Sequence, residues 1–242
     1  MRPRWLVTAG RILTQLSHDR RTVALLLVVP ALLVGLFAWL YQSDQVFQRI
    51  GPMVMALFPF ILMFLVTSVA TLRERRSGTL ERVLTAPGSK ADLICGYALA
   101  FSLVAVLQTG VTVGFSVWVC RLELAGSVLQ LLGVAVVDAV LGTALGLLVS
   151  AFARTEFQAV QFLPVFVFPQ IILGGVFMPR QQMPRALELI SDFMPLSYAI
   201  DGVSQVAAGQ GGWVVGRPLL IMAAFAVGCL VAASATLPRR TP

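Results

Sequence analysis

Few residues in this chain have side chains that could carry out chemistry, and their spacing does not suggest a catalytic set. The single histidine, His18, lies among N-terminal arginines and has no second histidine to work with. Three widely spaced cysteines, Cys95, Cys120 and Cys229, form no CxxC pair, and the sequence lacks the HExxH and Walker A patterns. We therefore predict no catalytic residue, no metal site and no cofactor bound by this chain.

Asp138 is the one ionisable residue deep inside an apolar stretch, "LLGVAVVDAVLGTALG". A charged carboxylate at the centre of a membrane helix costs about 2.5–3.5 kcal/mol, so Asp138 is expected to face the helix bundle or water, or to be protonated. It could contact a cationic or hydrogen-bonding substrate. Alternatively, it could be a packing residue bonded to a polar neighbour such as Gln108 or Thr112.

The most polar stretch of the chain is "RERRSGTLERVLTAPG", residues 73–88. Thr79 can cap a helix that Pro87 ends. Three apolar residues fall on one face of this short helix: Leu80, Val83 and Leu84. A helix of about two turns is unstable alone, so the membrane surface, the rest of the chain or a partner's groove should cover that face. A solvated basic loop is the alternative interpretation.

Composition indicates the class of protein that carries these residues. Of 242 residues, 58% are hydrophobic and 12% are charged, and mean hydropathy is +0.87. A soluble domain would have about a quarter charged residues. Continuous apolar runs without strand-like alternation predict an all-α polytopic membrane protein. Six segments have the length of a bilayer span: 22–41, 51–72, 93–119, 127–153, 157–178 and 218–237.

The distribution of Lys and Arg predicts the orientation. These residues gather before the first span, in the 73–92 loop and at the C-terminus, which places both ends in the cytoplasm. The net charge of +7 is explained in this way and does not indicate a nucleic-acid partner. In the fifth span, Pro164, Pro169 and the pair Gly174-Gly175 predict a bend or break near the outer side.

Two further segments are predicted to lie at the membrane surface. Residues 1–21 form an amphipathic interfacial helix with Trp5 as an anchor. The outer segment, 179–217, is long for a loop and contains a helical stripe over 186–194 before the last span.

Two separate motifs carry a family resemblance. Glu74 and Arg75, followed after two residues by "GTLERVLTAP", resemble the cytoplasmic loop of ABC-2 type permeases. "GGVFMPRQQMPRALELISDFMPLSYAIDGV", residues 174–203, is similar to the outer segment of that family, most of all to its daunorubicin-resistance branch. The resemblance covers essentially the whole chain and implies a single transmembrane domain over 1–242.

The resemblance implies a function for the polar loop. In such permeases this loop forms a coupling helix that docks on a cytoplasmic ATPase, so the apolar face would contact the ATPase. Polar contacts would come from Glu74, Arg75, Glu81 and Arg82, with Gly78 and Thr79 at the start of the helix. ATP and magnesium would then bind to the partner ATPase.

The resemblance also implies the whole assembly: two ATPase subunits, a second permease copy or paralogue, and a multi-pass location in a bacterial-type plasma membrane. The expected activity is export of a lipophilic compound, a drug, antibiotic or lipid, by alternating access. The fifth span would lie near the dimer interface and the substrate route. Gln161 and Gln170 are therefore substrate-path candidates beside Asp138, with hydrogen bonds between helices as the alternative.

Two other classes of function compete with this one. An ion-coupled secondary transporter should have several intramembrane charges in a relay, and the predicted spans offer only Asp138. A non-transporting membrane scaffold is the second rival, and an integral enzyme would need a catalytic set that the sequence lacks.

Overall fold

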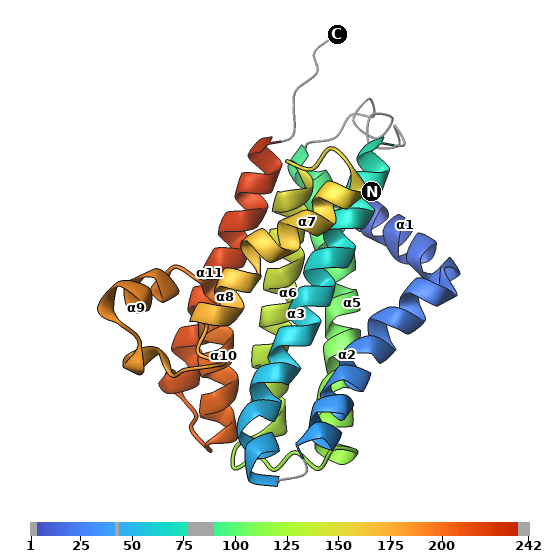
Figure 1. Cartoon of the computed structure of the whole chain (residues 1–242). Coiled ribbons are helices and arrows are strands. Elements are labelled where there is room, and N and C mark those ends of the chain that lie inside the picture. The colour runs from blue at the N-terminus through green and yellow to red at the C-terminus, as the bar shows by residue number, and fades with distance from the viewer. Residues whose placement is uncertain (1–3, 42–43, 77–89, 237–242) are drawn as a thin grey trace.

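The computed structural model describes residues 4–41, 44–76 and 90–236 (Figure 1). The described residues form helices and no strand, and six of these helical stretches are long and apolar enough to cross a membrane. The predicted all-α architecture with six spans is confirmed. The spanning helices are α2 (Arg20–Leu40), α3 (Asp44–Arg76), α5 (Lys90–Trp118), α6 (Val128–Ser150), the pair α7 (Glu156–Phe166) and α8 (Phe168–Leu173), and α11 (Trp213–Thr236).

Side-chain caps set where three helices begin. The Asp19 carboxylate accepts hydrogen bonds from the N–H and the hydroxyl of Thr22 at the start of α2, and these bonds lower the pKa of Asp19. The Ser127 hydroxyl accepts from Leu129 N at the start of α6, and the Thr155 hydroxyl accepts from Gln158 N at the start of α7. Each cap satisfies a first-turn N–H that has no partner within its own helix.

The fifth span is broken, as its prolines predicted. α7 ends at Phe166 and α8 begins at Phe168. The first turn of α8 contains Pro169, which has no N–H to continue the ladder. α8 ends at Leu173, before the predicted end at 178, because Gly174 and then Gly175, with φ +99°, turn the chain away.

α3 is the longest helix and has α6 as its main partner. It begins at Asp44 rather than at 51 and includes Pro52 and Pro59. Gly142 and Gly146 of α6 face the α3 backbone: a Cβ at either glycine would lie 2.5 Å from the carbonyl oxygen of Phe60 or Phe64 respectively. Two successive turns of α6 therefore contact α3 without side chains between the backbones.

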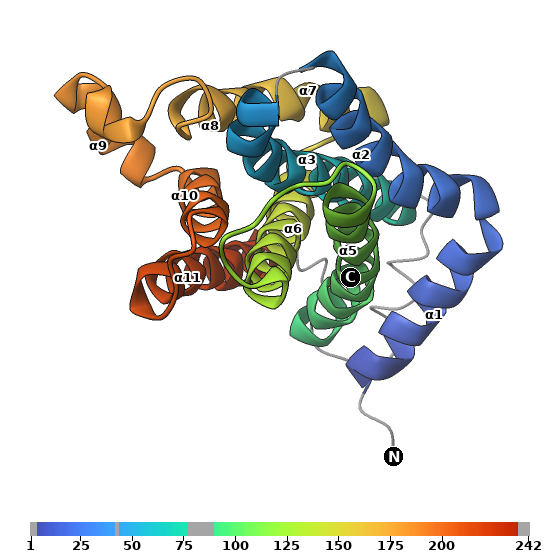
Figure 2. The ribbon, with the colours of Figure 1, turned by 90° about the horizontal axis from the view of Figure 1, so that it is seen from below.

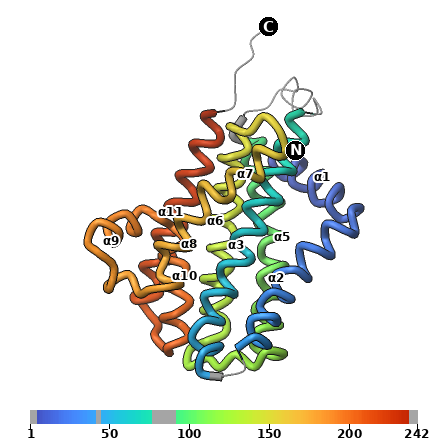
Figure 3. Tube along the Cα trace, viewed as in Figure 1, coloured from blue at the N-terminus to red at the C-terminus, as the bar shows by residue number. Residues whose placement is uncertain are grey.

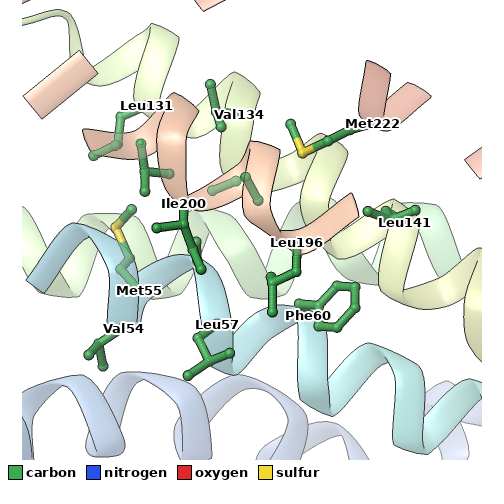
Figure 4. Close-up of a cluster of buried hydrophobic side chains, with 14 of the residues drawn as sticks. Val54, Met55, Leu57, Phe60, Leu131, Val134, Leu141, Leu196, Ile200 and Met222 are labelled. Carbon is green, nitrogen blue, oxygen red and sulfur yellow. The ribbon is translucent and has the colours of Figure 1, made fainter. Parts of the chain in front are cut away.

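The outer segment contributes more to the core than the sequence indicated. It forms a 3₁₀ turn η1 (Arg180–Gln182), α9 (Arg185–Asp192) and α10 (Pro195–Ala207). The helix predicted over 186–194 is α9, and α10 was not predicted. Figure 4 shows Leu196 and Ile200 of α10 among Phe60 of α3 and Met222 of α11, and all four are 2% exposed or less.

α1 (Arg4–His18) forms where the amphipathic helix was predicted. Its apolar side, including Ala9 and Ile12, is buried against α5 in a cluster with Tyr97. Gly96 permits this approach, because a Cβ there would lie 2.6 Å from the Thr8 Cβ. Figure 2 shows α1 passing beside α5 at the edge of the bundle. Its place at a membrane surface stays a prediction.

The connections fall at two ends of the bundle (Figures 1 and 3). The last turns of α3, α6 and α11 lie at one end, which we call the basic end after its arginines: Arg11, Arg73, Arg75, Arg76 and Arg154. The end of α2 and the start of α3 lie at the opposite end, together with the α5–α6 and α10–α11 connections. This arrangement puts the start of α1 and the end of α11 on the same side of the bundle.

Candidate coupling region and substrate path

Most of the predicted ATPase-coupling residues lie outside the described residues. They are Gly78, Thr79, Leu80, Glu81, Arg82, Val83 and Leu84. The predicted short helix over 79–86 therefore stays a prediction. Glu74 and Arg75 belong to the last turn of α3, immediately before that stretch.

The basic end of α3 is joined to three other helices by three consecutive residues. Arg73 donates two hydrogen bonds of 2.8 Å, from Nε and Nη2, to the two carboxylate oxygens of Glu156 at the start of α7. Glu74 accepts a 3.0 Å hydrogen bond from Arg11 Nη2 of α1. Arg75 donates from Nη1 to the Ser150 carbonyl at the end of α6. Successive residues point about 100° apart around a helix, so one turn reaches three neighbours.

These contacts differ in their exposure. The Arg73 and Glu156 side chains are 66% and 46% exposed, so solvent screens their attraction, although two parallel bonds fix their geometry. The Glu74 side chain is only 12% exposed. Glu74 and Arg75 thus make contacts within the chain that hold α3 against α1 and α6. We call residues 73–75 with their partners the α3 junction.

The structure places Asp138 inside the bundle formed by one chain. Its side chain is fully buried, and neither carboxylate oxygen has a hydrogen-bond partner among the described residues. Gln108 of α5 is equally buried, and its amide also has no partner there. Thr112, the other suggested partner, donates its hydroxyl hydrogen bond to the Gln108 carbonyl instead. The hydrogen bond suggested between Asp138 and either neighbour is not formed.

Gln170 makes the helix–helix hydrogen bonds that were the alternative to a substrate contact. Its Nε2 donates to the Phe166 carbonyl at the end of α7, at 2.8 Å. Its Oε1 accepts from Leu196 N in the first turn of α10, at 3.2 Å. The side chain is 4% exposed. One amide therefore links the broken fifth span to α10.

Gln161 lies in a different environment from the other two candidates. It is exposed on α7, where neighbouring apolar side chains such as Phe157 and Val165 are also exposed. The structure therefore does not gather Asp138, Gln161 and Gln170 into one site.

A polar cluster in the outer segment was missed by the sequence reasoning. The Arg180 guanidinium donates to Ser191 Oγ at 2.9 Å, to Asp201 Oδ2 at 2.7 Å and to Asp192, and its Cζ lies 5.3 Å from the centre of the Tyr198 ring. Burial raises the pKa of Asp201, and Arg180 opposes that rise. We call these five residues the Arg180 cluster. The sequence did contain a signal for this cluster, because all five residues fall within the family-like motif at 174–203.

The match to known proteins covers the elements just described. Residues 5–207, from α1 through α10, match the ABC-2 type transporter family. This chain belongs to the ABC-2 type transporter family. The matched region includes α1, the α3 junction and the outer segment with its Arg180 cluster, so both motifs from the sequence lie within it.

Two of three relatives of this ABC-2 chain are named as permeases. The chain is 29% identical over 179 residues to the probable multidrug ABC transporter permease YbhR of Escherichia coli K12, covering 72% of this chain and 48% of the relative. It is 26% identical over 152 residues to the linearmycin resistance permease protein LnrN of Bacillus subtilis 168, covering 62% and 39%. Nodulation protein J of Rhizobium meliloti 1021 is 26% identical over 174 residues, covering 69% and 64%.

The aligned region spans about half the length of the first of these relatives and less of the second. The comparisons and the six apolar helices establish a multi-pass membrane protein of the ABC-2 family, and some of its relatives are named as transporter permeases.

Proposed function

We propose that this chain is the membrane-spanning permease subunit of an ATP-driven exporter. The observation that carries the proposal is the family match over 5–207, which includes the charged end of α3 where an ATPase would act. The cargo would be lipophilic, a drug, antibiotic or lipid-like compound. Relatives named for multidrug and linearmycin resistance support this class of substrate.

The α3 junction suggests how motion would enter the membrane domain. The proposed coupling residues follow Arg76 directly, and α3 is joined there to α1, α6 and α7. A force applied to the 77–89 segment would therefore act on four helices together. Glu74 and Arg75 would act as positioning residues for that segment, while Glu81 and Arg82 would contact the ATPase.

The remaining partners follow from the family. Two copies of a separate ATPase would hold ATP and magnesium, and a second permease copy or paralogue would complete the route. Closure of the ATPases would switch the permease pair from inward-facing to outward-facing, which is alternating access. Gln161, exposed on α7, is available to a substrate, whereas Asp138 and Gln170 would need their helices to separate first.

The docking assignment is tested by two substitutions in the proposed coupling helix. Leu80→Asp places a charge on its apolar face, and Glu81→Arg reverses the charge at its rim. We expect both variants to reach the membrane at normal levels and to lose co-purification of the ATPase. Arg154→Glu, a charge reversal at an exposed residue of the same end, serves as the control and should retain the ATPase. Normal association in both test variants would contradict the assignment.

Ion-coupled transport and a scaffold remain the competing functions. Within the described part of the chain, Asp138 is the one fully buried acidic or basic residue, which is too few for a charge relay. Export that continues when the partner ATPase cannot hydrolyse ATP would favour ion coupling over the exporter.

A further inference from the structure

A cavity of about 620 Å³ lies at the opposite end of the bundle from the coupling region. Its walls are the first turns of α3, the segment that follows α8, and α10; Figure 2, viewed from this end, shows these elements close together. Its volume falls within the range of about 300–1,000 Å³ that is usual for small-molecule sites. The proposed coupling function does not use this cavity.

The cavity has one cation whose charge is not balanced by a neighbour. Arg49 of α3 lines the wall and is exposed, and none of the described carboxylates lies within 4 Å of its guanidinium. Arg180 also lines the cavity, but Asp192 and Asp201 already pair with it. Arg49 is therefore the group that remains available to an anion.

Part of the wall beside Arg49 is suited to an apolar tail. Ile50 and Met53 continue from Arg49 along α3, and Val176 and Ile200 lie on the other sides. Burying alkyl groups against such a surface is favourable, because it removes apolar area from water. A cation at one position and apolar walls beside it match a molecule with both an acidic head and a hydrocarbon chain.

Arg49 also lines a second cavity, and comparing the two cavities indicates which of them would bind an anionic ligand. The second cavity has about 640 Å³, shares Arg49, Met53 and Ser204 with the first, and lies between α3 and the α5–α6 connection. Glu123 lines this second cavity, and its carboxylate would repel an anion. The first cavity is free of that repulsion, because its one carboxylate, Asp201, is paired with Arg180.

We propose that the first cavity binds an acidic amphiphile from the surrounding membrane leaflet, with its phosphate or carboxylate on Arg49 and its chain along Ile50 and Met53. Such a ligand is a lipid or a lipid-like cargo molecule with one or more negative charges. Binding needs neither the ATPase nor transport. The proposal can therefore fail while the exporter assignment stands, and the reverse is also possible.

The test measures binding of radiolabelled dodecyl phosphate to the purified full-length chain in neutral dodecyl maltoside. Arg49→Gln removes the charge and should weaken binding by about tenfold or more, as expected for loss of a charge-assisted hydrogen bond. Arg217→Gln removes the same charge at an exposed position of α11 that lines neither cavity, and should leave binding unchanged. Ile50→Trp fills the first cavity and should abolish binding, whereas Ala208→Trp fills the second and should not.

Competition separates a lipid site from a site for small anions. Unlabelled dodecyl phosphate should displace the probe, and inorganic phosphate at the same concentration should not. Equal effects of Arg49→Gln and Arg217→Gln on probe binding would overturn the proposal. Displacement of the probe by inorganic phosphate would also overturn it, and so would a loss of binding in Ala208→Trp but not in Ile50→Trp. Because Arg49 is exposed, Arg49→Gln should fold normally, and it keeps the test decisive if Ile50→Trp is unstable.

Discussion

The amide of Gln170 joins two helices that the sequence alone could not place together. Its position in a span predicted to line the route made it a candidate for substrate contact, with helix–helix bonding as the alternative. The structure shows that both ends of the amide are bonded, one to Phe166 and one to Leu196. A polar group whose hydrogen bonds are already made has less to offer a substrate.

Replacing Gln170 should therefore affect stability. Gln170→Leu leaves the buried N–H of Leu196 without its partner, and we expect it to lower the free energy of unfolding by about 1–3 kcal/mol. Thermal melting of the purified protein in detergent measures this loss. Gln161→Leu, the same change at an exposed residue of α7, is the control and should melt as the native protein does. A Gln170→Leu variant with native melting but impaired export would instead show a substrate contact.

For Asp138, the sequence predicted the burial of the side chain better than it predicted its neighbours. The sequence predicted that this carboxylate faces the bundle or water, and the structure buries its side chain fully inside the bundle. Which neighbours it would have depended on the rotation of α5 and α6 about their axes, and a run of apolar residues does not define that rotation. Neither suggested hydrogen bond, to Gln108 or to Thr112, is present.

Among the elements, α3 and α6 form the contact on which the bundle depends. The GxxxG spacing of Gly142 and Gly146 was visible in the sequence, but such spacing is common by chance in glycine-rich spans. In the structure, the two glycines are required by the backbone of α3. The carbonyl oxygens of Phe60 and Phe64 occupy the space that side chains at positions 142 and 146 would need. Only the packed structure identifies that partner.

Adding a methyl group at this contact should separate the helices. We expect Gly142→Ala and Gly146→Ala each to destabilise the protein by about 1–3 kcal/mol, because the methyl group would overlap backbone that cannot move aside. The matched control is Gly133→Ala, also in α6, where nothing lies within 4 Å of the added Cβ. The measurement is the melting temperature in detergent, and equal values for all three variants would contradict the assigned contact.

α10 was missed for a physical reason. Its 13 residues are too few to span a bilayer, and it lies in a segment with charged residues on either side, such as Arg185 and Arg217. Its burial depends on α8 ending at Leu173, which leaves the space between α3, α6 and α11 that Leu196 and Ile200 fill. The sequence of α10 taken alone cannot show that the short α8 leaves this space free.

For the chain as a whole, the sequence predicted the number of spans and their approximate positions. Long apolar runs are strong signals because a bilayer demands about 20 such residues per helix. The exact ends were less predictable: α3 continues past Pro52 to Asp44, and α11 begins at Trp213 rather than at 218. A proline near the start of a membrane helix is tolerated, so it was a poor guide to the boundary.

The orientation of the bundle is open to a direct test. With Cys95, Cys120 and Cys229 replaced by serine, single cysteines are introduced at two exposed positions, Arg154 at the basic end and Glu123 at the opposite end. We expect a membrane-impermeant maleimide added to intact cells to label Glu123→Cys at once, and Arg154→Cys only after permeabilisation. The reverse pattern would show that the arginine-rich end faces outward.

The length of α3 gives the two ends of the molecule a mechanical connection. Its 33 residues extend about 50 Å, so one helix carries both the α3 junction and Arg49. Pro52 and Pro59 lie seven residues apart, on nearly the same face, and both belong to the half that holds Arg49. From Phe60 to its end the helix has no proline, so its backbone hydrogen-bond ladder is not interrupted there, whereas Pro52 and Pro59 each lack the N–H that the ladder uses. We therefore expect any bend of α3 to fall at Pro52 or Pro59, and a bend at Pro59 would change the shape of the cavity beside Arg49.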